Sequence, residues 1–145
     1  MNIQIKRFEE LTIAELYEIL RCRAEVFIVE QESIYQDIDE LDKHSTHLYI
    51  EDNGKIKAYL RVIDPGVKFA AGSIGRVLVM KEYRGQGLAR PIMAKAIEIA
   101  SSKADTIEIE AQSYLLEFYK SLGFIPISEE FILEGRAHIS MMLKF

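Results

Sequence analysis

Residues 74–100 read IGRVLVMKEYRGQGLARPIMAKAIEIA, a strand, a glycine-rich turn and a helix in direct succession. Residues 74–80 are almost continuously apolar, which is typical of a strand covered on both faces and predicts a central place in a sheet. The helix after the turn carries apolar side chains on one face: Ile92, Met93, Ala96, Ile97 and Ala100. An alternating strand at 106–111 completes a strand–helix–strand unit with a right-handed crossover. This unit predicts a mixed α/β sheet.

The flanking segments supply further strands and two more helices. Thr12 and Glu15 have the spacing of a capping box, which predicts a helix from there to about residue 29. The pair Asn53 and Gly54 between two apolar stretches, residues 48–50 and 56–62, predicts a β-hairpin. Residues 114–122 predict a helix that Gly123 ends. Residues 124–133 and 137–144 predict a closing hairpin.

Composition excludes several classes of protein. The 145 residues include 18 basic and 23 acidic side chains, a formal charge of −5, whereas a general nucleic-acid binder needs a basic field. No apolar run reaches the ~18 residues of a membrane helix, and the first ten residues lack the apolar core of a signal peptide. We expect one domain over residues 1–145 and a cytoplasmic location. A single cysteine, Cys22, agrees with a reducing compartment and predicts a small buried side chain.

Charge is unevenly distributed along the chain. Residues 76–95 hold five basic side chains and one acid, a net charge of +4, around the turn at 84–89. Glycines at a helix start expose successive N–H groups, which favours phosphate oxygens. No Gly-Lys-Ser/Thr ends the turn, which excludes a Walker loop, and Arg90 stands where a dinucleotide fingerprint needs glycine or alanine. A turn that serves only to reverse the chain sharply remains an alternative.

Two motifs together resemble the GNAT superfamily of N-acetyltransferases. Arg84-x-x-Gly87-x-Ala89 after an apolar strand is similar to its pyrophosphate-binding motif, and residues 118–124, FYKSLGF, are similar to its second signature. Within the superfamily, residues 26–31 (VFIVEQ), 35–39 (YQDID) and 47–48 (HL) resemble the ElaA-like acetyltransferases. The resemblance implies a GNAT fold, a mixed and mostly antiparallel central sheet of about seven strands flanked by helices. Homodimers are common in this superfamily, so a homodimer is one expectation.

The resemblance also implies an acetyl-CoA site. The strand at 77–79 would pair with the pantetheine arm, and the N–H groups of 84–89 would hold the pyrophosphate. Gln112 stands where the family often has asparagine, and Tyr119 matches the residue that donates a proton to the thiolate sulfur. The implied cofactor-binding residues are Val77, Leu78, Val79, Arg84, Gly85, Gln86, Gly87, Leu88, Ala89, Arg90, Gln112 and Tyr119.

Acetyl transfer to an amine also needs a group that removes a proton from the ammonium. Six acids between residues 30 and 42 face no basic residue, which fits either an amine pocket or a solvated loop. We favour Glu30 as the base, because partial burial at the helix end would raise its pKa. His47 is a second candidate, for substrate binding or proton relay, or else a merely hydrogen-bonded histidine. His138 on the last strand stays unassigned.

Two further residue patterns bear on the site. His44 and His47 have no cysteine partner and no favourable geometry, so we expect no metal. Arg76 lies inside an apolar strand and is expected to pair with an acid near the site.

Two functions follow from these observations. The first is an N-acetyltransferase that transfers the acetyl group of acetyl-CoA to a primary amine, on a small molecule or a peptide. The second is a noncatalytic acyl-CoA-binding module, which would bind the thioester without turnover. The sequence does not choose among polyamines, aminosugars, amino acids and protein N-termini as acceptors.

Overall fold

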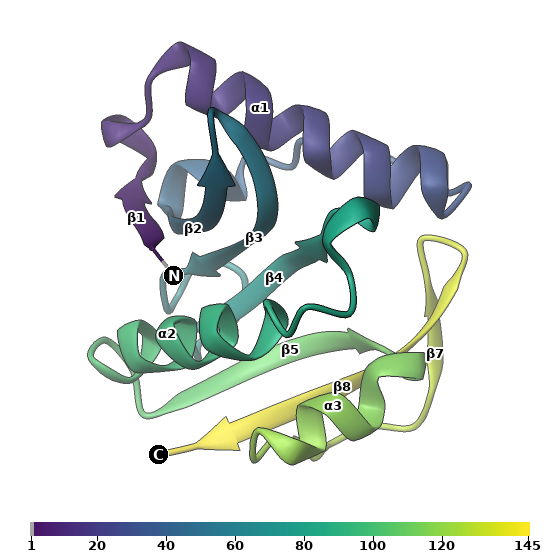
Figure 1. The fold of residues 1–145 in the computed structure, drawn as a ribbon. Helices are drawn as coiled ribbons and strands as arrows, with labels where there is room; N and C mark the ends of the chain where they lie inside the picture. The colour runs from purple at the N-terminus through teal and green to yellow at the C-terminus, as the bar shows by residue number, and fades with distance from the viewer. Residues whose placement is uncertain (1) are drawn as a thin grey trace.

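The computed structural model describes residues 2–145 and contains two four-stranded sheets (Figure 1). The first sheet consists, in spatial order, of β1 (Ile3–Arg7), β2 (Ser45–Asp52), β3 (Lys55–Ile63) and β4 (Ser73–Val79). The second consists of β5 (Thr106–Gln112), β8 (Arg136–Lys144) and β6 (Ile125–Pro126), with β7 (Phe131–Leu133) also paired to β8. All strand pairs within the two sheets are antiparallel. The fold is a mixed α/β fold with eight strands among residues 2–145, one more than expected, because the predicted strand at 124–133 is divided into β6 and β7.

The helices cover opposite faces of the first sheet. Thr12 and Glu15 form the predicted capping box at the start of α1 (Ile13–Arg23), which continues as a π-helical segment, η2 (Ala24–Glu30). Four apolar residues of α1 and η2, Cys22 among them, are buried with residues of β2, β3 and β4. The other face packs against α2 (Ala89–Ser101), and α3 (Leu116–Ser121) follows the short 3₁₀ turn η5 (Ser113–Leu115). Three further 3₁₀ turns are η1 (Phe8–Glu10), η3 (Leu41–His44) and η4 (Lys81–Tyr83).

The hairpin between β2 and β3 has the predicted turn. Asn53 and Gly54 have φ values of 51° and 77°, and a tight two-residue hairpin turn of this kind requires positive φ at both positions. The glycine fits this conformation without strain, and the turn fixes the register of the two strands.

Within residues 2–145, backbone pairing joins the two sheets only at the start of β4 and β5. Gly72 and Ile107 form a parallel bridge, in which the Gly72 N–H donates to Thr106 O at 3.1 Å and the Glu108 N–H donates to Gly72 O at 2.9 Å. Beyond this bridge the strands diverge and belong to separate sheets (Figure 1). The expectation that residues 74–80 form a strand central in its sheet was therefore wrong: β4 is the last strand of its sheet, and one of its edges is open.

A bulge marks the middle of β4. Arg76 has a φ of 53°, in the left-handed region that non-glycine residues rarely occupy, and the register between β3 and β4 shifts at Tyr59 and Arg61. The bulge turns the second half of β4 away from β5.

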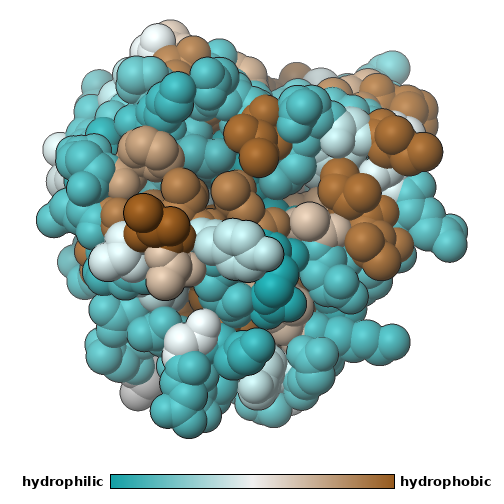
Figure 2. Space-filling model, turned by 90° about the horizontal axis from the view of Figure 1, so that it is seen from above, coloured by the Kyte–Doolittle hydropathy of each residue, from teal (hydrophilic) through white to brown (hydrophobic). Residues whose placement is uncertain are grey.

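The surface seen from above is mostly hydrophilic, with hydrophobic side chains in several patches separated by hydrophilic ones (Figure 2). Ile13 and Tyr17 on α1 are among the exposed apolar residues. Within residues 2–145, no helix combines the length and the apolar character needed to span a membrane.

Candidate active site

A cavity of about 720 Å³ lies where β4 and β5 diverge. Its walls come from η2 and the following loop, β4, β5, α3 and the β7–β8 hairpin. Because these elements are far apart in sequence, the site exists only in the folded chain.

The open edge of β4 forms one wall of this cavity. Val77, Leu78 and Val79 line it, and within residues 2–145 β4 is paired with β3 alone beyond the Gly72 bridge. The Arg84 Nε donates to Val79 O at 2.9 Å. An unpaired strand edge offers its backbone groups to an extended ligand with amide bonds.

Arg76 at the bulge pairs with acids, as its place in an apolar strand predicted. Its Nε donates to Asp37 Oδ1 at 2.8 Å, and its Nη2 lies 3.0 Å from Asp37 O and 3.4 Å from Asp39 Oδ2. These bonds hold the strained residue and connect β4 to the loop that follows η2.

The glycine turn leads directly into α2. Gly85 and Gly87 have φ values of 81° and 73°, and a Cβ built on either would meet no heavy atom within 4 Å. The turn therefore needs glycine for its backbone conformation, and the space beside it is open. Pro91 lies in the first turn of α2, where its missing N–H costs no helical hydrogen bond. The exposed N–H groups at this helix start suit an anionic ligand.

Glu30 does not have the environment expected of a base. Its carboxylate accepts two hydrogen bonds from Arg84, at 2.6 and 2.9 Å, and its side chain keeps 35% of its surface exposed. The Arg84 guanidinium lowers the pKa of Glu30, and this effect exceeds that of burial. The expectation of a raised pKa was therefore wrong, because a cation binds the carboxylate.

Arg90 lies against α3. Its Nη2 donates to Ser121 Oγ at 2.9 Å, and the guanidinium carbon lies 5.4 Å from the centre of the Phe118 ring. Arg90 thus stands beside the glycine turn without an acidic partner among residues 2–145.

Tyr119 lines the cavity from α3. Its ring packs edge-on against Phe118 and Phe124, with centroids 5.3 and 5.9 Å away, and only 6% of the residue is exposed. Burial raises the pKa of Tyr119 well above its ordinary value. The hydroxyl therefore stays protonated near neutral pH and is able to donate a hydrogen bond into the cavity.

Gln112 connects both sides of the cavity. Its Nε2 donates to Gln31 Oε1 at 3.1 Å, and its Oε1 accepts from Arg136 Nε at 2.9 Å. The three side chains join the end of η2 to β5 and β8. Gln112 also lines the cavity.

His47 lies away from the cavity. It is fully buried, its Nε2 is 3.0 Å from Asp42 O, and its Nδ1 is 2.7 Å from the Tyr59 hydroxyl. Because a carbonyl oxygen only accepts, Nε2 donates and Nδ1 accepts. Burial lowers the pKa of His47, so the ring stays neutral. The structure thus places this candidate in a structural hydrogen-bond network.

Three of the six acids between residues 30 and 42 are neutralised by arginines that the sequence patterns did not single out. The Arg23 guanidinium binds Asp37 at 3.0 Å and Asp42 at 2.6 Å, and the Arg61 guanidinium binds Asp42 and Asp39. Burial raises the pKa of Asp39, but hydrogen bonds and charge from Arg61 outweigh it and hold this pKa at about 2. The expectation that these acids are uncompensated was wrong, because the partners come from α1 and β3. Arg61 is the one charged residue in the otherwise apolar second half of β3, residues 58–63, which was the available signal.

Three more polar residues line the cavity without having been assigned to it. Glu110 on β5 pairs with Lys68 at 2.6 Å, and His138 on β8 lies with its Nδ1 2.8 Å from Arg136 O. Alternation along β5 and β8 was the signal that could have placed Glu110 and His138 on one face.

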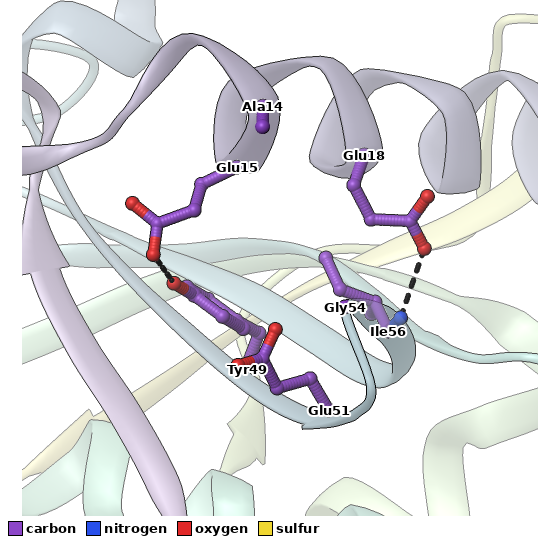
Figure 3. Close-up of a pocket in the computed structure, with 7 residues that line it drawn as sticks. All are labelled: Ala14, Glu15, Glu18, Tyr49, Glu51, Gly54 and Ile56. Atoms are coloured by element: carbon purple, nitrogen blue, oxygen red, sulfur yellow. Dashed lines mark hydrogen bonds between the residues drawn. The ribbon is translucent and has the colours of Figure 1, made fainter.

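A second, small cavity of about 90 Å³ lies between α1 and the β2–β3 hairpin (Figure 3). Glu15 accepts a hydrogen bond from the Tyr49 hydroxyl at 2.8 Å, and Glu18 accepts one from the Ile56 N–H at 2.9 Å. These carboxylates fix α1 to the hairpin, so the cavity is structural. Among residues 2–145, no cluster of three His, Cys, Asp or Glu side chains is arranged to hold a metal ion.

Comparison with known proteins decides the family. Residues 11–145 match the acetyltransferase (GNAT) domain. The chain belongs to the GNAT acetyltransferase family. This GNAT protein is 35% identical over 136 residues to protein ElaA of Escherichia coli, an alignment that covers 91% of this chain and 89% of ElaA.

Solved structures show the same relationship. The crystal structure of an acyl-CoA N-acyltransferase from Pseudomonas aeruginosa matches with a TM-score of 0.91 and 32% identity, over 99% of each chain. The crystal structure of E. coli ElaA matches with a TM-score of 0.89 and 32% identity, over 99% of this chain and 100% of ElaA. This GNAT protein is therefore an ElaA-like acyltransferase.

Proposed function

We propose that this protein transfers the acetyl group of acetyl-CoA to a primary amine by direct attack of the amine on the thioester. The observation that carries the proposal is the cavity between the diverging strands, into which the open edge of β4 and the Tyr119 side chain both face. An acyl-CoA is long and thin, with amide bonds in its middle and phosphates at one end. The cavity matches the acyl thioester at the other end, the strand edge matches the amide bonds, and the glycine turn matches the phosphates.

The cofactor-binding residues have distinct parts in this proposal. Backbone groups of 77–79 pair with the pantetheine amides, and the N–H groups of Gly85 to Ala89 bind the pyrophosphate. Arg84 and Arg90 lie beside the turn, and their present partners, Glu30 and Ser121, are exposed enough to exchange for phosphate oxygens.

The chemistry requires three groups on the protein. A backbone N–H of β4 stabilises the oxyanion of the tetrahedral intermediate, and the Tyr119 hydroxyl donates a proton to the leaving thiolate. A base takes a proton from the substrate ammonium, and the resulting neutral amine then attacks the thioester. Arg84 binds Glu30 and lowers its pKa, which makes this carboxylate a poor proton acceptor. In this proposal Glu30 instead modulates the charge of Arg84 beside the phosphate-binding turn.

Thiol release from acetyl-CoA in the presence of a broad panel of amines tests this function. We expect amine-dependent release, which the Tyr119→Phe variant slows by about 10²-fold while its affinity for acetyl-CoA stays the same. Tyr17→Phe, which removes the hydroxyl of an exposed tyrosine on α1, is the matched control. Tight acetyl-CoA binding without turnover on any amine would instead identify a noncatalytic acyl-CoA-binding module.

A further inference from the structure

We propose that His138 is the general base of the acetyl transfer, and that its Nε2 takes the proton from the acceptor ammonium. The assignment rests on the proposed function. It replaces Glu30 and His47, whose proton-accepting atoms are occupied by Arg84 and by the Tyr59 hydroxyl.

His138 and Tyr119 line the cavity from opposite faces of the second sheet. Tyr119 belongs to the apolar core on the helix side, together with Ile109 and Ala111 of β5. His138 is the register partner of Gln112, and side chains of successive strand residues point to opposite faces, so His138 faces away from that core. Tyr119, the proposed proton donor, lies on the side from which the thioester would enter. His138, the proposed proton acceptor, lies on the side from which the amine would enter.

The hydrogen bond of His138 fixes which nitrogen is free. Its Nδ1 lies 2.8 Å from Arg136 O, and a carbonyl oxygen only accepts, so Nδ1 carries the hydrogen. The neutral ring therefore has its lone pair on Nε2. Within residues 2–145, no group hydrogen-bonds this Nε2. The ring also stacks on Phe131, with centroids 6.1 Å apart and planes at 26°, which holds its orientation.

The other ionisable groups on this wall of the cavity are paired or solvated. Glu110 of β5 is bound to Lys68, and Arg136 of β8 donates to Gln112. Glu134 is exposed at the turn between β7 and β8. Across the cavity, Asp39 is bound to Arg61. His138 is 8% exposed, and imidazole is the side chain that exchanges protons most readily near neutral pH.

Protons and bonds balance in the proposed step. Nε2 of His138 takes one proton from the ammonium and later passes it to solvent. The neutral nitrogen forms a C–N bond to the thioester carbon, and the C–S bond then breaks. The nitrogen loses a second proton when the amide forms. The Tyr119 hydroxyl donates a proton to the leaving thiolate, and the second proton from the nitrogen balances this donation, so the net products are the amide, the thiol and one proton.

The test compares His138→Asn with wild type. Asparagine places an N–H donor near the position of Nδ1, so it is able to keep the bond to Arg136 O while it removes the proton-accepting nitrogen. We expect kcat/KM for the amine to fall by about 10²-fold at neutral pH, with KM for acetyl-CoA unchanged. The deficit shrinks as pH rises, because the free amine then forms without a base. His44→Asn, an exposed histidine on η3, is the matched control and keeps wild-type rates.

The outcomes separate this assignment from the proposed function. Wild-type turnover together with equal turnover by His138→Asn across the pH range overturns the base assignment alone. No thiol release by the wild-type protein with any amine overturns both. Nitrogen NMR of the His138 imidazole in the wild-type protein gives an independent check of the tautomer. A hydrogen on Nδ1 supports the assignment, and a hydrogen on Nε2 of the neutral ring overturns it.

Discussion

The Glu30 carboxylate and the Arg84 guanidinium are joined by two hydrogen bonds, of 2.6 and 2.9 Å, across 54 residues of sequence. The pair connects the end of η2 to the turn that precedes α2. The Glu30 carboxylate thus lies near the N–H groups proposed to bind phosphate and neutralises the charge of Arg84.

Removal of the Glu30 charge is expected to strengthen acetyl-CoA binding. In Glu30→Gln, Arg84 loses its anionic partner and is free to meet a phosphate. Exposed ion pairs are worth ~1 kcal/mol or less, so the gain in affinity is at most about fivefold. Isothermal titration calorimetry at low and high salt measures it, and Glu32→Gln, an exposed acid two residues away, serves as control. An activity–pH profile that loses its acidic limb in Glu30→Gln would show that Glu30 is the base after all.

Gly87→Ala separates backbone strain from ligand binding. At a φ of 73° a Cβ costs about 1–2 kcal/mol, and in the turn it also stands beside the N–H groups that would bind phosphate. Gly54→Ala, at a φ of 77° in the β2–β3 turn, carries the same strain far from the cavity. We expect both variants to lose similar stability in urea unfolding and only Gly87→Ala to raise KM for acetyl-CoA. Equal KM values in the two variants would count against a phosphate site at this turn.

The arginine–aspartate cluster is expected to be the most sensitive polar part of the core. Arg23 is completely buried, and Arg23→Met leaves Asp37 and Asp42 without their shared partner, at a cost of about 3–5 kcal/mol. Arg21→Met, two residues away, removes only a partly exposed pair with Glu18 and costs ~1 kcal/mol or less. Chemical denaturation of both variants measures the difference, and equal losses would contradict the role assigned to the cluster.

Acid is expected to weaken the contact between α1 and the first sheet. Burial raises the pKa of Glu15, but hydrogen bonds from Lys6, Thr12 and Tyr49 outweigh it and lower the pKa from 4.5 to about 2. A carboxyl whose pKa is lower in the folded state stabilises that state above its unfolded pKa, and this stability is lost as pH falls from about 4.5 toward 2.

The matching measurement is the free energy of unfolding between pH 6 and 2. Glu15→Gln should show a shallower loss over this window than wild type, because the titrating carboxyl is absent. Glu25→Gln, an exposed acid outside this contact, should follow the wild-type curve. Parallel curves for Glu15→Gln and wild type would show that this carboxyl does not contribute.

The local elements could be predicted because their causes are local. The capping box of Thr12 and Glu15, the Asn53–Gly54 turn and the apolar faces of α1 and α2 each depend on residues a few positions apart. The glycine turn and the segment around Tyr119 also lie within short stretches, so the residues by themselves were enough to indicate the family.

Tertiary structure alone decided which of the candidate residues reach the cavity. Charges summed along the chain cannot show that Arg23 and Arg61 neutralise the acidic run, because the partners lie 14–22 residues apart and meet only when α1, η3 and β3 pack. Two histidines on strands look alike in sequence, yet His47 is enclosed between Asp42 and Tyr59 while His138 lines the cavity. The difference arises from packing: η3 and β3 enclose His47 on β2, whereas β8 borders the space between the diverging strands β4 and β5.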